Sequence, residues 1–267
     1  MALLGWIGMG RIGTQMATLL LQAGHKLVVH DLDKERLKPA LDHGARAGAT
    51  PAALAAECEA VCLSVTDTDA VDSIVFGKDG VAAGGGTGKL LVDHTSIHPG
   101  RTREMAARLE KQSGMHWVDA PVSGSPGRNL AIFLGGAEGD VARVSPWVAA
   151  FAKKITHVGA VGAGQVVKSC NQAIVCTTLT AWAEVLQYAE RLGLDPAILM
   201  AAVEGGGADS SVRRYFMPDL LGHDLPYETL RNLLKDLEMQ RDMARSTSLA
   251  MPVNEAVGAN FARVFQK

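Results

Sequence analysis

The order of hydrophobic and polar residues divides the chain into two parts with different periods. Up to about residue 158, short apolar runs typical of buried strands alternate with segments whose apolar residues recur at helical spacing. The runs are LLGWIGM, KLVVHD, AVCLSV, KLLVDHT and HWVDAPV, and the segments between them include TQMATLLLQAG, KERLKPALDHG and RTREMAARLEKQSG. This alternation predicts an α/β unit with a parallel sheet and right-handed βαβ crossovers.

After GAVGAG the strand signals stop and the helix signals become longer. We expect a long helix over residues 163–192, then LDPAILMAAVEGG, YETLRNLLKDLEMQRDMARS and a last helix near 252–265. The expected division is an α/β domain at 1–160 and an all-α domain at 161–267. The polar, glycine-rich stretch GGGADSSVRRYF is either a loop or part of a cleft.

Composition narrows the classes of partner. Lys plus Arg number 26 against 28 Asp plus Glu, and no basic stripe is present, so the chain does not have the charge of a nucleic-acid-binding or membrane-surface protein. No apolar run is long enough to span a bilayer. Four cysteines, Cys58, Cys62, Cys170 and Cys176, stand in apolar runs without a CxxC pair, which is typical of reduced core thiols. We therefore expect a cytoplasmic protein with a small-molecule partner.

A glycine motif stands at the very start of the chain. GWIGMGRIG follows a strand, opens a helix and has the spacing GxGxxG. These glycines permit a tight turn, close approach of the backbone to a pyrophosphate, and close packing of helix on strand. The motif predicts a Rossmann-type dinucleotide site. Its candidate contacts are Gly8, Met9, Gly10, Arg11, Ile12 and Gly13.

The next strand ends at Asp31, about 20 residues after the glycines, where a carboxylate can bind both ribose hydroxyls of NAD and repel the 2′-phosphate of NADP. NAD is therefore the expected cofactor. Lys34 and Arg36 keep NADP as the alternative, because a nearby cation could hold the phosphate. Asp31 could also be only a turn residue that caps the following helix, a role equally open to Asp33.

The stretch VGAGQVVKSCNQ places Lys168 and Asn171 on one face of the predicted long helix, with Gln172 beside them. A buried ammonium is costly, so Lys168 either reaches solvent or takes part in chemistry. Burial and a neighbouring cation would lower its pKa from about 10.4 towards about 7 to 8, where proton transfer is efficient. Asn171 could hold a substrate oxygen without adding charge.

With the glycine loop, DAPVSG and GAGQVVKSCNQ in this order, the chain resembles the β-hydroxyacid dehydrogenase family over nearly its whole length. That family includes 3-hydroxyisobutyrate dehydrogenase and tartronate semialdehyde reductases. The resemblance implies a Rossmann domain followed by an all-α domain, joined by a long helix that carries a catalytic lysine, here Lys168, with Asn171 as its partner. It also implies a homodimer or homotetramer.

The resemblance assigns further roles by position. Ser123 and Gly124 of DAPVSG would surround the substrate carboxylate, and Lys235 of LLKDL, next to Asp236, would close over cofactor and substrate. The remaining implied cofactor contacts are Val65, Thr66 and Ser96. The chain departs from the family in a shorter segment after VSGS, in Ser125 at a position often occupied by glycine, and in ending at NFARVFQK, where relatives commonly continue.

Each assignment has a plainer alternative. Ser123 could be only a turn hydroxyl, and Lys235 could form an ordinary surface pair with a neighbouring acid. His94 and His98 have metal-like spacing, but no third ligand is evident, so no metal is expected. The expected activity is hydride transfer between NAD(H) and a small 3-hydroxy acid or its semialdehyde or keto acid. The rivals are an imine reductase and a non-catalytic dinucleotide-binding module.

Overall fold

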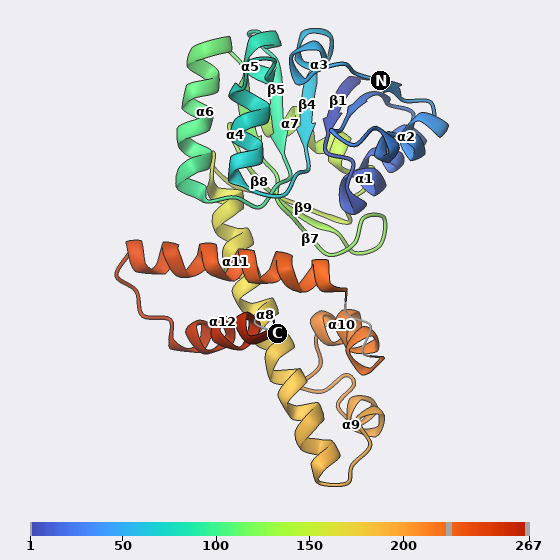
Figure 1. The fold of residues 1–267 in the computed structure, drawn as a ribbon, viewed down its shortest axis with the longest axis vertical. Helices are drawn as coiled ribbons and strands as arrows, with labels where there is room; N and C mark the ends of the chain where they lie inside the picture. The colour runs from blue at the N-terminus through green and yellow to red at the C-terminus, as the bar shows by residue number, and fades with distance from the viewer. Residues whose placement is uncertain (1, 223–225, 265–267) are drawn as a thin grey trace. The chain divides into compact units, whose positions relative to one another are not determined.

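The computed structural model describes residues 2–222 and 226–264. The chain forms two compact units, Met1–Lys168 and Ser169–Lys267, and the division falls inside a long helix. The first unit is α/β and the second is helical, as the ribbon in Figure 1 shows. The predicted fold class is confirmed.

The first unit is built on a mostly parallel sheet. The strands are β1 (Leu3–Ile7), β2 (Lys26–His30), β3 (Arg46–Ala47), β4 (Ala60–Leu63), β5 (Leu90–Asp93), β6 (His116–Asp119), β7 (Val122–Ser123), β8 (Ala131–Gly135) and β9 (Lys154–Gly159). The parallel part runs in the order β3-β2-β1-β4-β5-β6, which is the Rossmann order with its reversal between β1 and β4. β8 pairs antiparallel with β6 and β7, and parallel with β9.

Helices cover both faces of this sheet. They are α1 (Arg11–Gln22), the 3-10 turn Lys34–Leu37, α2 (Lys38–Asp42), α3 (Pro51–Glu57), α4 (Thr68–Phe76), α5 (Val81–Gly84), α6 (Pro99–Ser113) and α7 (Glu138–Val148). Residues of α1, α2 and α7 form one core with alternate strand residues, and residues of α3 to α6 form the other core with the remaining ones. Along β4, for example, Cys62 belongs to the first core and Val61 to the second. The continuous apolar strands of the sequence follow from this burial on both sides.

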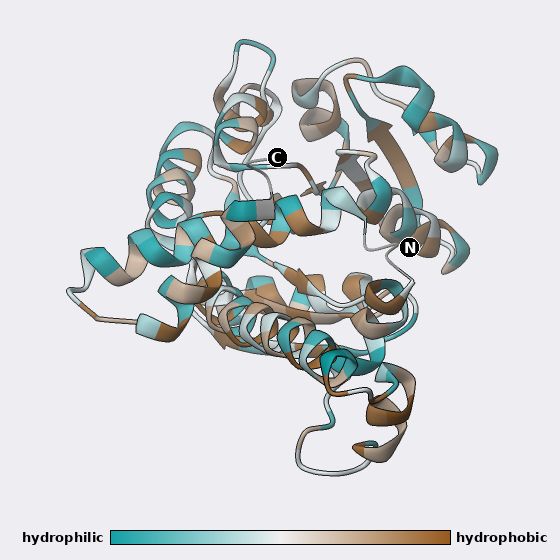
Figure 2. Ribbon diagram, turned by 60° about the horizontal axis from the view of Figure 1, so that its bottom comes forward, coloured by the Kyte–Doolittle hydropathy of each residue, from teal (hydrophilic) through white to brown (hydrophobic). Residues whose placement is uncertain are grey.

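The second unit is a helical assembly. Its elements are α8 (Ala163–Arg191), whose first residues belong to the first unit, α9 (Pro196–Ala202), α10 (Ser211–Leu221), α11 (Tyr227–Ser246) and α12 (Pro252–Val264). Trp182 of α8, Leu237 of α11 and Phe261 of α12 share its core. Figure 2 shows that these helices alternate apolar and polar residues along their length. Within the described ranges, no helix combines the length and the apolarity needed to cross a membrane.

The expected elements match the structure where periodicity is strong. The five apolar runs form β1, β2, β4, β5 and β6, and the three expected helices after the long one form α9, α11 and α12. Hydrogen bonds within GGGADSSVRRYF show the local structure of this stretch, which could have been a loop or part of a cleft. Ser210 caps the start of α10. Asp209 accepts hydrogen bonds from Gly205 N, Arg213 and Arg214. This stretch is therefore a self-bonded loop that leads into a helix.

Candidate active site

The residues that the sequence selects in the first unit gather at the carboxyl edge of the parallel strands. The glycine loop follows β1, Asp31 follows β2, Val65 and Thr66 follow β4, and Ser96 follows β5. Because parallel strands end at the same edge of a sheet, these segments lie along one side of the unit, where open α/β sheets bind ligands.

The glycine loop has the geometry of a phosphate cradle. A Cβ atom on Gly13 would lie 2.1 Å from Gly8 O, so helix α1 packs directly on the turn after β1. A Cβ on Gly10 would meet no atom within 4 Å, so the space beside this backbone is open. Gly10 is also the N-cap residue of α1, and no side chain caps that helix end. Free N–H groups and the helix dipole therefore face an open space that suits an anion.

Asp31 closes this cradle from β2. Its carboxylate accepts hydrogen bonds from Met9 N at 2.7 Å and from Asp33 N at 2.9 Å. A carboxylate has about four lone-pair sites, so it retains acceptor capacity for ribose hydroxyls. The capping role is taken by Asp33, whose side chain accepts from Glu35 N. Lys34 Nζ donates to Asp31 O, and Arg36 pairs with Asp33 at 3.3 Å.

The loops after β4 and β5 are bonded to each other. Val65 N donates to Thr95 Oγ1 at 3.2 Å, and Thr95 N donates to the Asp93 carboxylate at 2.9 Å. Thr66 is exposed and donates to Asp67, while Ser96 is half-buried. These bonds fix Thr95, the residue directly before Ser96.

Ser123 and Gly124 lie where β7 turns into the loop before β8. Ser123 is half-buried, and Gly124 has a φ of 101°, a left-handed conformation that favours glycine. The segment after Ser125 is a closed turn, because Ser125 N donates to Asn129 Oδ1 at 2.9 Å and Arg128 N donates to Ser125 O. Ser123 itself belongs to β7 and pairs with Ala131 of β8.

Helix α8 begins on two groups that the sequence reading did not select. Asp119, at the end of β6, is fully buried and accepts hydrogen bonds from Gly162 N at 2.6 Å and Gln165 N at 3.0 Å. Burial raises the pKa of Asp119 to about 6 against the opposing effect of these bonds. The Gln165 side chain bonds Thr95 O and Ile97 N.

Lys168 follows one turn later and is 6% exposed, so it does not reach solvent as a surface lysine would.

The second unit holds a polar chain on the same helix. Asn171 Nδ2 donates to Gln172 Oε1 at 3.1 Å, and Gln172 Nε2 donates to the Asp236 carboxylate at 2.9 Å. Gln172 and Asp236 are buried, and Lys235 Nζ lies 3.7 Å from Asp236 Oδ1. The structure thus brings Asn171 and Lys235 to two ends of one network. Gln172 is the member that sequence reasoning noted only as a neighbour.

The histidines with metal-like spacing have other partners. His94 Nδ1 bonds Ala120 O and the ring stacks on Trp6 at 5.4 Å, while His98 Nδ1 accepts from Gly100 N at the start of α6. Burial lowers the pKa of His94 to about 4, so its ring is neutral at pH 7. Among the described residues, no three His, Cys, Asp or Glu side chains form a group suited to a metal ion.

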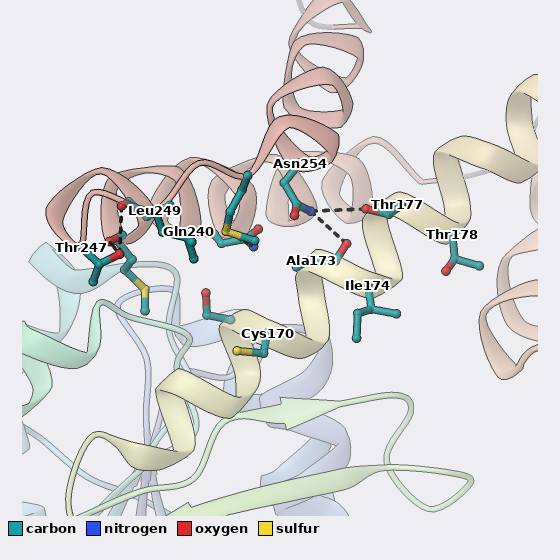
Figure 3. A pocket seen from close by; sticks show the side chains of 13 residues that line it. Cys170, Ala173, Ile174, Thr177, Thr178, Gln240, Thr247, Leu249 and Asn254 are labelled. Carbon is teal, nitrogen blue, oxygen red and sulfur yellow. Dashed lines mark hydrogen bonds between the residues drawn. The ribbon is translucent and has the colours of Figure 1, made fainter.

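The cysteines divide into two kinds. Cys58, Cys62 and Cys176 are buried, and burial raises the pKa of the Cys58 and Cys62 thiols to about 12. The expectation of a core position was wrong for Cys170, which is exposed. It lines a pocket of about 490 Å³ on the second unit, with Ile174, Gln240 and Asn254 (Figure 3). An apolar run on a helix does not show which of its residues turn outward.

Comparison with known proteins identifies the whole chain. Residues 3–159 match the family model of the NAD binding domain of 6-phosphogluconate dehydrogenase, and residues 162–267 match the model NAD-binding of NADP-dependent 3-hydroxyisobutyrate dehydrogenase. The chain belongs to the β-hydroxyacid dehydrogenase family. The resemblance predicted from the sequence motifs is confirmed.

Relatives in this family cover most of both chains. The 2-hydroxy-3-oxopropionate reductase of Escherichia coli (strain K12) is 32% identical over 254 residues, which are 93% of this chain and 86% of that protein. A probable 3-hydroxyisobutyrate dehydrogenase-like protein of Arabidopsis thaliana is 33% identical, over 93% of this chain and 83% of its own. Among solved structures, 3-hydroxyisobutyrate dehydrogenase of Mycobacterium tuberculosis with L-serine has a TM-score of 0.88 at 26% identity, covering 99% of this chain and 94% of that one.

More distant structures share the fold alone. The imine reductase of Streptomyces aurantiacus has a TM-score of 0.68 at 18% identity, over 98% of this chain and 93% of its own.

The first unit is that of a nicotinamide dinucleotide-binding β-hydroxyacid dehydrogenase, and its residues fit the cofactor. The open cradle at Gly10 and the uncapped start of α1 suit the pyrophosphate, and the Asp31 carboxylate suits a ribose.

Proposed function

We propose that this protein is an NAD-dependent oxidoreductase that interconverts a small 3-hydroxy acid and its semialdehyde or keto acid, with Lys168 as the general acid and base. The observation that carries the proposal is the burial of Lys168 on the helix that starts at the carboxyl edge of the dinucleotide-binding sheet. A nicotinamide dinucleotide bound there supplies or accepts the hydride. The buried ammonium is well suited to exchange the proton of the substrate hydroxyl.

The other residues of the proposed site bind and orient the substrate. The Ser123 hydroxyl and the Gly124 backbone grip the carboxylate, and the Asn171 amide holds the substrate oxygen or Lys168. Lys235 contacts cofactor and substrate. The Gln172–Asp236 chain supports this role for Asn171, because it fixes the amide that presents the hydrogen-bonding group.

The substrate class is a short anionic hydroxy acid or aldehyde. Relatives named 3-sulfolactaldehyde reductase, at 30% identity, and L-threonate dehydrogenase, at 31%, cover 96% and 97% of this chain. With 2-hydroxy-3-oxopropionate reductase, these names share a small polar substrate with an acidic head. That shared head supports the assignment of a carboxylate or sulfonate grip to Ser123.

NAD is the proposed cofactor over NADP. Asp31 places a carboxylate at the end of β2, and a 2′-phosphate beside it would meet a like charge. The two cations that favoured NADP have local partners, because Lys34 donates to Asp31 O and Arg36 pairs with Asp33. These contacts support discrimination against the phosphate.

A homodimer formed through α8 is the proposed assembly, with a tetramer as the alternative. Exposed or half-buried uncharged residues recur along this helix, and at Leu192 directly after it, at steps of three or four, as in a helix–helix seam. This set, named the α8 stripe, consists of Ile174, Thr178, Ala181, Val185, Tyr188 and Leu192. Ile174, Tyr188 and Leu192 are each 65% to 68% exposed. An uncharged apolar stripe is self-complementary, so a second copy can pair with it about a twofold axis. The cytoplasmic location stays a prediction.

The test of the activity is an initial-rate assay of NAD reduction across a panel of small 3-hydroxy acids, with NADP in parallel. We expect turnover of one or more acids with NAD, and a fall in kcat of about 10²- to 10⁴-fold in Lys168→Ala with cofactor affinity retained. Lys78→Ala, at an exposed lysine of the first unit, is the matched control and should behave as the native protein. Unchanged turnover in Lys168→Ala would refute the role of this lysine.

A further inference from the structure

The start of α8 depends on one buried carboxylate. The first N–H groups of a helix have no partners within it, and Asp119 accepts two of those at the start of α8, from Gly162 and Gln165. Its side chain is 0% exposed, and it comes from β6, far from α8 in the sequence. The beginning of α8 is thereby attached to the end of a central strand.

Glycines make room for this attachment. A Cβ on Gly135 would lie 2.4 Å from Asp119 Oδ1, and a Cβ on Gly164 would lie 2.7 Å from Asp119 Oδ2 and 2.3 Å from Phe133 O. Neither position accepts a side chain without moving the helix or the strand. The close approach of α8 to the sheet is therefore a specific feature of these residues.

Gln165 adds a second attachment, to the loop that follows the neighbouring strand β5. Its Nε2 donates to Thr95 O at 2.7 Å and its Oε1 accepts from Ile97 N at 3.2 Å, so one fully buried amide bonds the backbone on both sides of Ser96. Lys168 is three residues later on the same helix face. Asp119, Gln165, Ser96 and Lys168 all belong to the first unit.

We infer that Asp119 and Gln165 are positioning residues for Lys168, because they hold the first turn of α8 against the sheet. The inference rests on the proposed role of Lys168 in proton transfer. A general acid must be held within a fraction of an ångström of its working position, and a displacement of about 1 Å can cost about 100-fold in rate. Two hydrogen-bonded contacts in the turn before Lys168 supply that constraint.

The test compares Asp119→Asn and Gln165→Ala with the native enzyme. Asn keeps one acceptor oxygen and loses the other, and Ala removes both bonds of Gln165 while it leaves Asp119 in place. We expect kcat to fall by about 10- to 100-fold in each variant, with KM and the dissociation constant of NAD unchanged. Asp195→Asn is the matched control, since Asp195 caps α9 in the second unit, and its kcat should be native.

A double variant separates positioning from general stability. If Asp119 acts through Lys168, then Asp119→Asn should cause no further loss of turnover in the Lys168→Ala background. Native kcat in both single variants, with only a lower unfolding temperature, would overturn the inference, as would a full additional loss in the double variant. Native turnover in Lys168→Ala would instead refute the proposed function, so the two failures are distinguishable. Gln165→Ala decides the case if Asp119→Asn does not fold.

Discussion

At the scale of single residues, His94 shows how burial selects a protonation state. Its ring is 3% exposed, stacks on Trp6 and meets the edge of Phe151 at 5.7 Å. Nδ1 bonds Ala120 O, and burial lowers the pKa to about 4. The folded protein therefore holds a neutral imidazole where an unfolded chain would take up a proton near pH 6.5.

His94 should contribute to stability above pH 6.5 and lose that contribution as the pH falls towards 4. The folded pKa is below the unfolded one, so acid favours unfolding, by about 3 kcal/mol over this range. Asp119 acts in the opposite direction, because its raised pKa of about 6 makes its ionisation above that pH destabilising. We expect the free energy of unfolding of His94→Phe to fall less on acidification than that of the native protein.

Urea unfolding at pH 7.5 and pH 4.5 measures this effect. The Asp119 contribution is common to both proteins and cancels in their difference. His43→Gln, at an exposed histidine, is the control and should follow the native curve. Parallel curves for the native protein and His94→Phe would contradict the prediction.

At the scale of elements, two glycines in the turn from β1 to α1 have different roles: one is needed for packing, and the other borders the proposed binding space. Gly13 is required by the chain itself, because its missing Cβ is what allows contact with Gly8 O. Gly10 is not required by packing, since nothing lies within 4 Å of its Cβ position. The space beside Gly10 is where the proposed pyrophosphate would lie.

Alanine substitutions should separate the two roles. Gly13→Ala should lower the free energy of unfolding by about 1 to 3 kcal/mol through overpacking. Gly10→Ala should leave the unfolding temperature native and weaken NAD binding by about 10- to 100-fold, because the methyl group occupies the pyrophosphate space. Thermal unfolding and calorimetric titration with NAD measure both quantities.

Gly86→Ala is the control for Gly10→Ala. Gly86 also has nothing within 4 Å of its Cβ position, but it lies in the loop before β5. It should keep native stability and native affinity. Native affinity in Gly10→Ala would place the cofactor elsewhere.

At the scale of the whole molecule, the α8 stripe is the surface at which we expect a second copy of the chain to bind. Val185 and Tyr188 are 44% and 65% exposed on one face of α8, and Leu192, directly after this helix, is 67% exposed. Ile174 and Thr178, at its other end, also line the pocket of Figure 3. Apolar stripe and pocket are therefore continuous, and pairing with a second copy would cover both.

Charge in the stripe should prevent that pairing. We expect light scattering to give twice the mass of one chain for the native protein and the mass of one chain for Val185→Glu/Tyr188→Glu, because pairing would bury like charges against each other. Gln187→Glu adds a charge at an exposed position of α8 outside the stripe and should stay dimeric. A native monomer would contradict the assembly.

Local sequence determined the elements with a strong period and the motif with strict backbone demands. The buried strands β1, β4 and β5 are continuous apolar runs because both faces are covered. The GxGxxG motif is recognisable in part because a Cβ at Gly8 or Gly13 would collide with backbone oxygens. The short or half-exposed strands β3, β7 and β9 lack such a signal. Their existence depends on the neighbouring strands with which they pair.

Only the tertiary structure decided which distant residues act together. Asp119 and Gln165 meet across 46 positions of the chain, Gln165 and Thr95 across 70, and Gln172 and Asp236 across 64. The hydrophobic periodicity of the sequence cannot predict such pairs, because hydrogen bonding between buried groups depends on how whole helices and strands pack. The sequence could indicate Lys168 as a candidate, because a lysine in an apolar helix is a local feature. The groups that hold its helix, Asp119 and Gln165, could be recognised only in the folded structure.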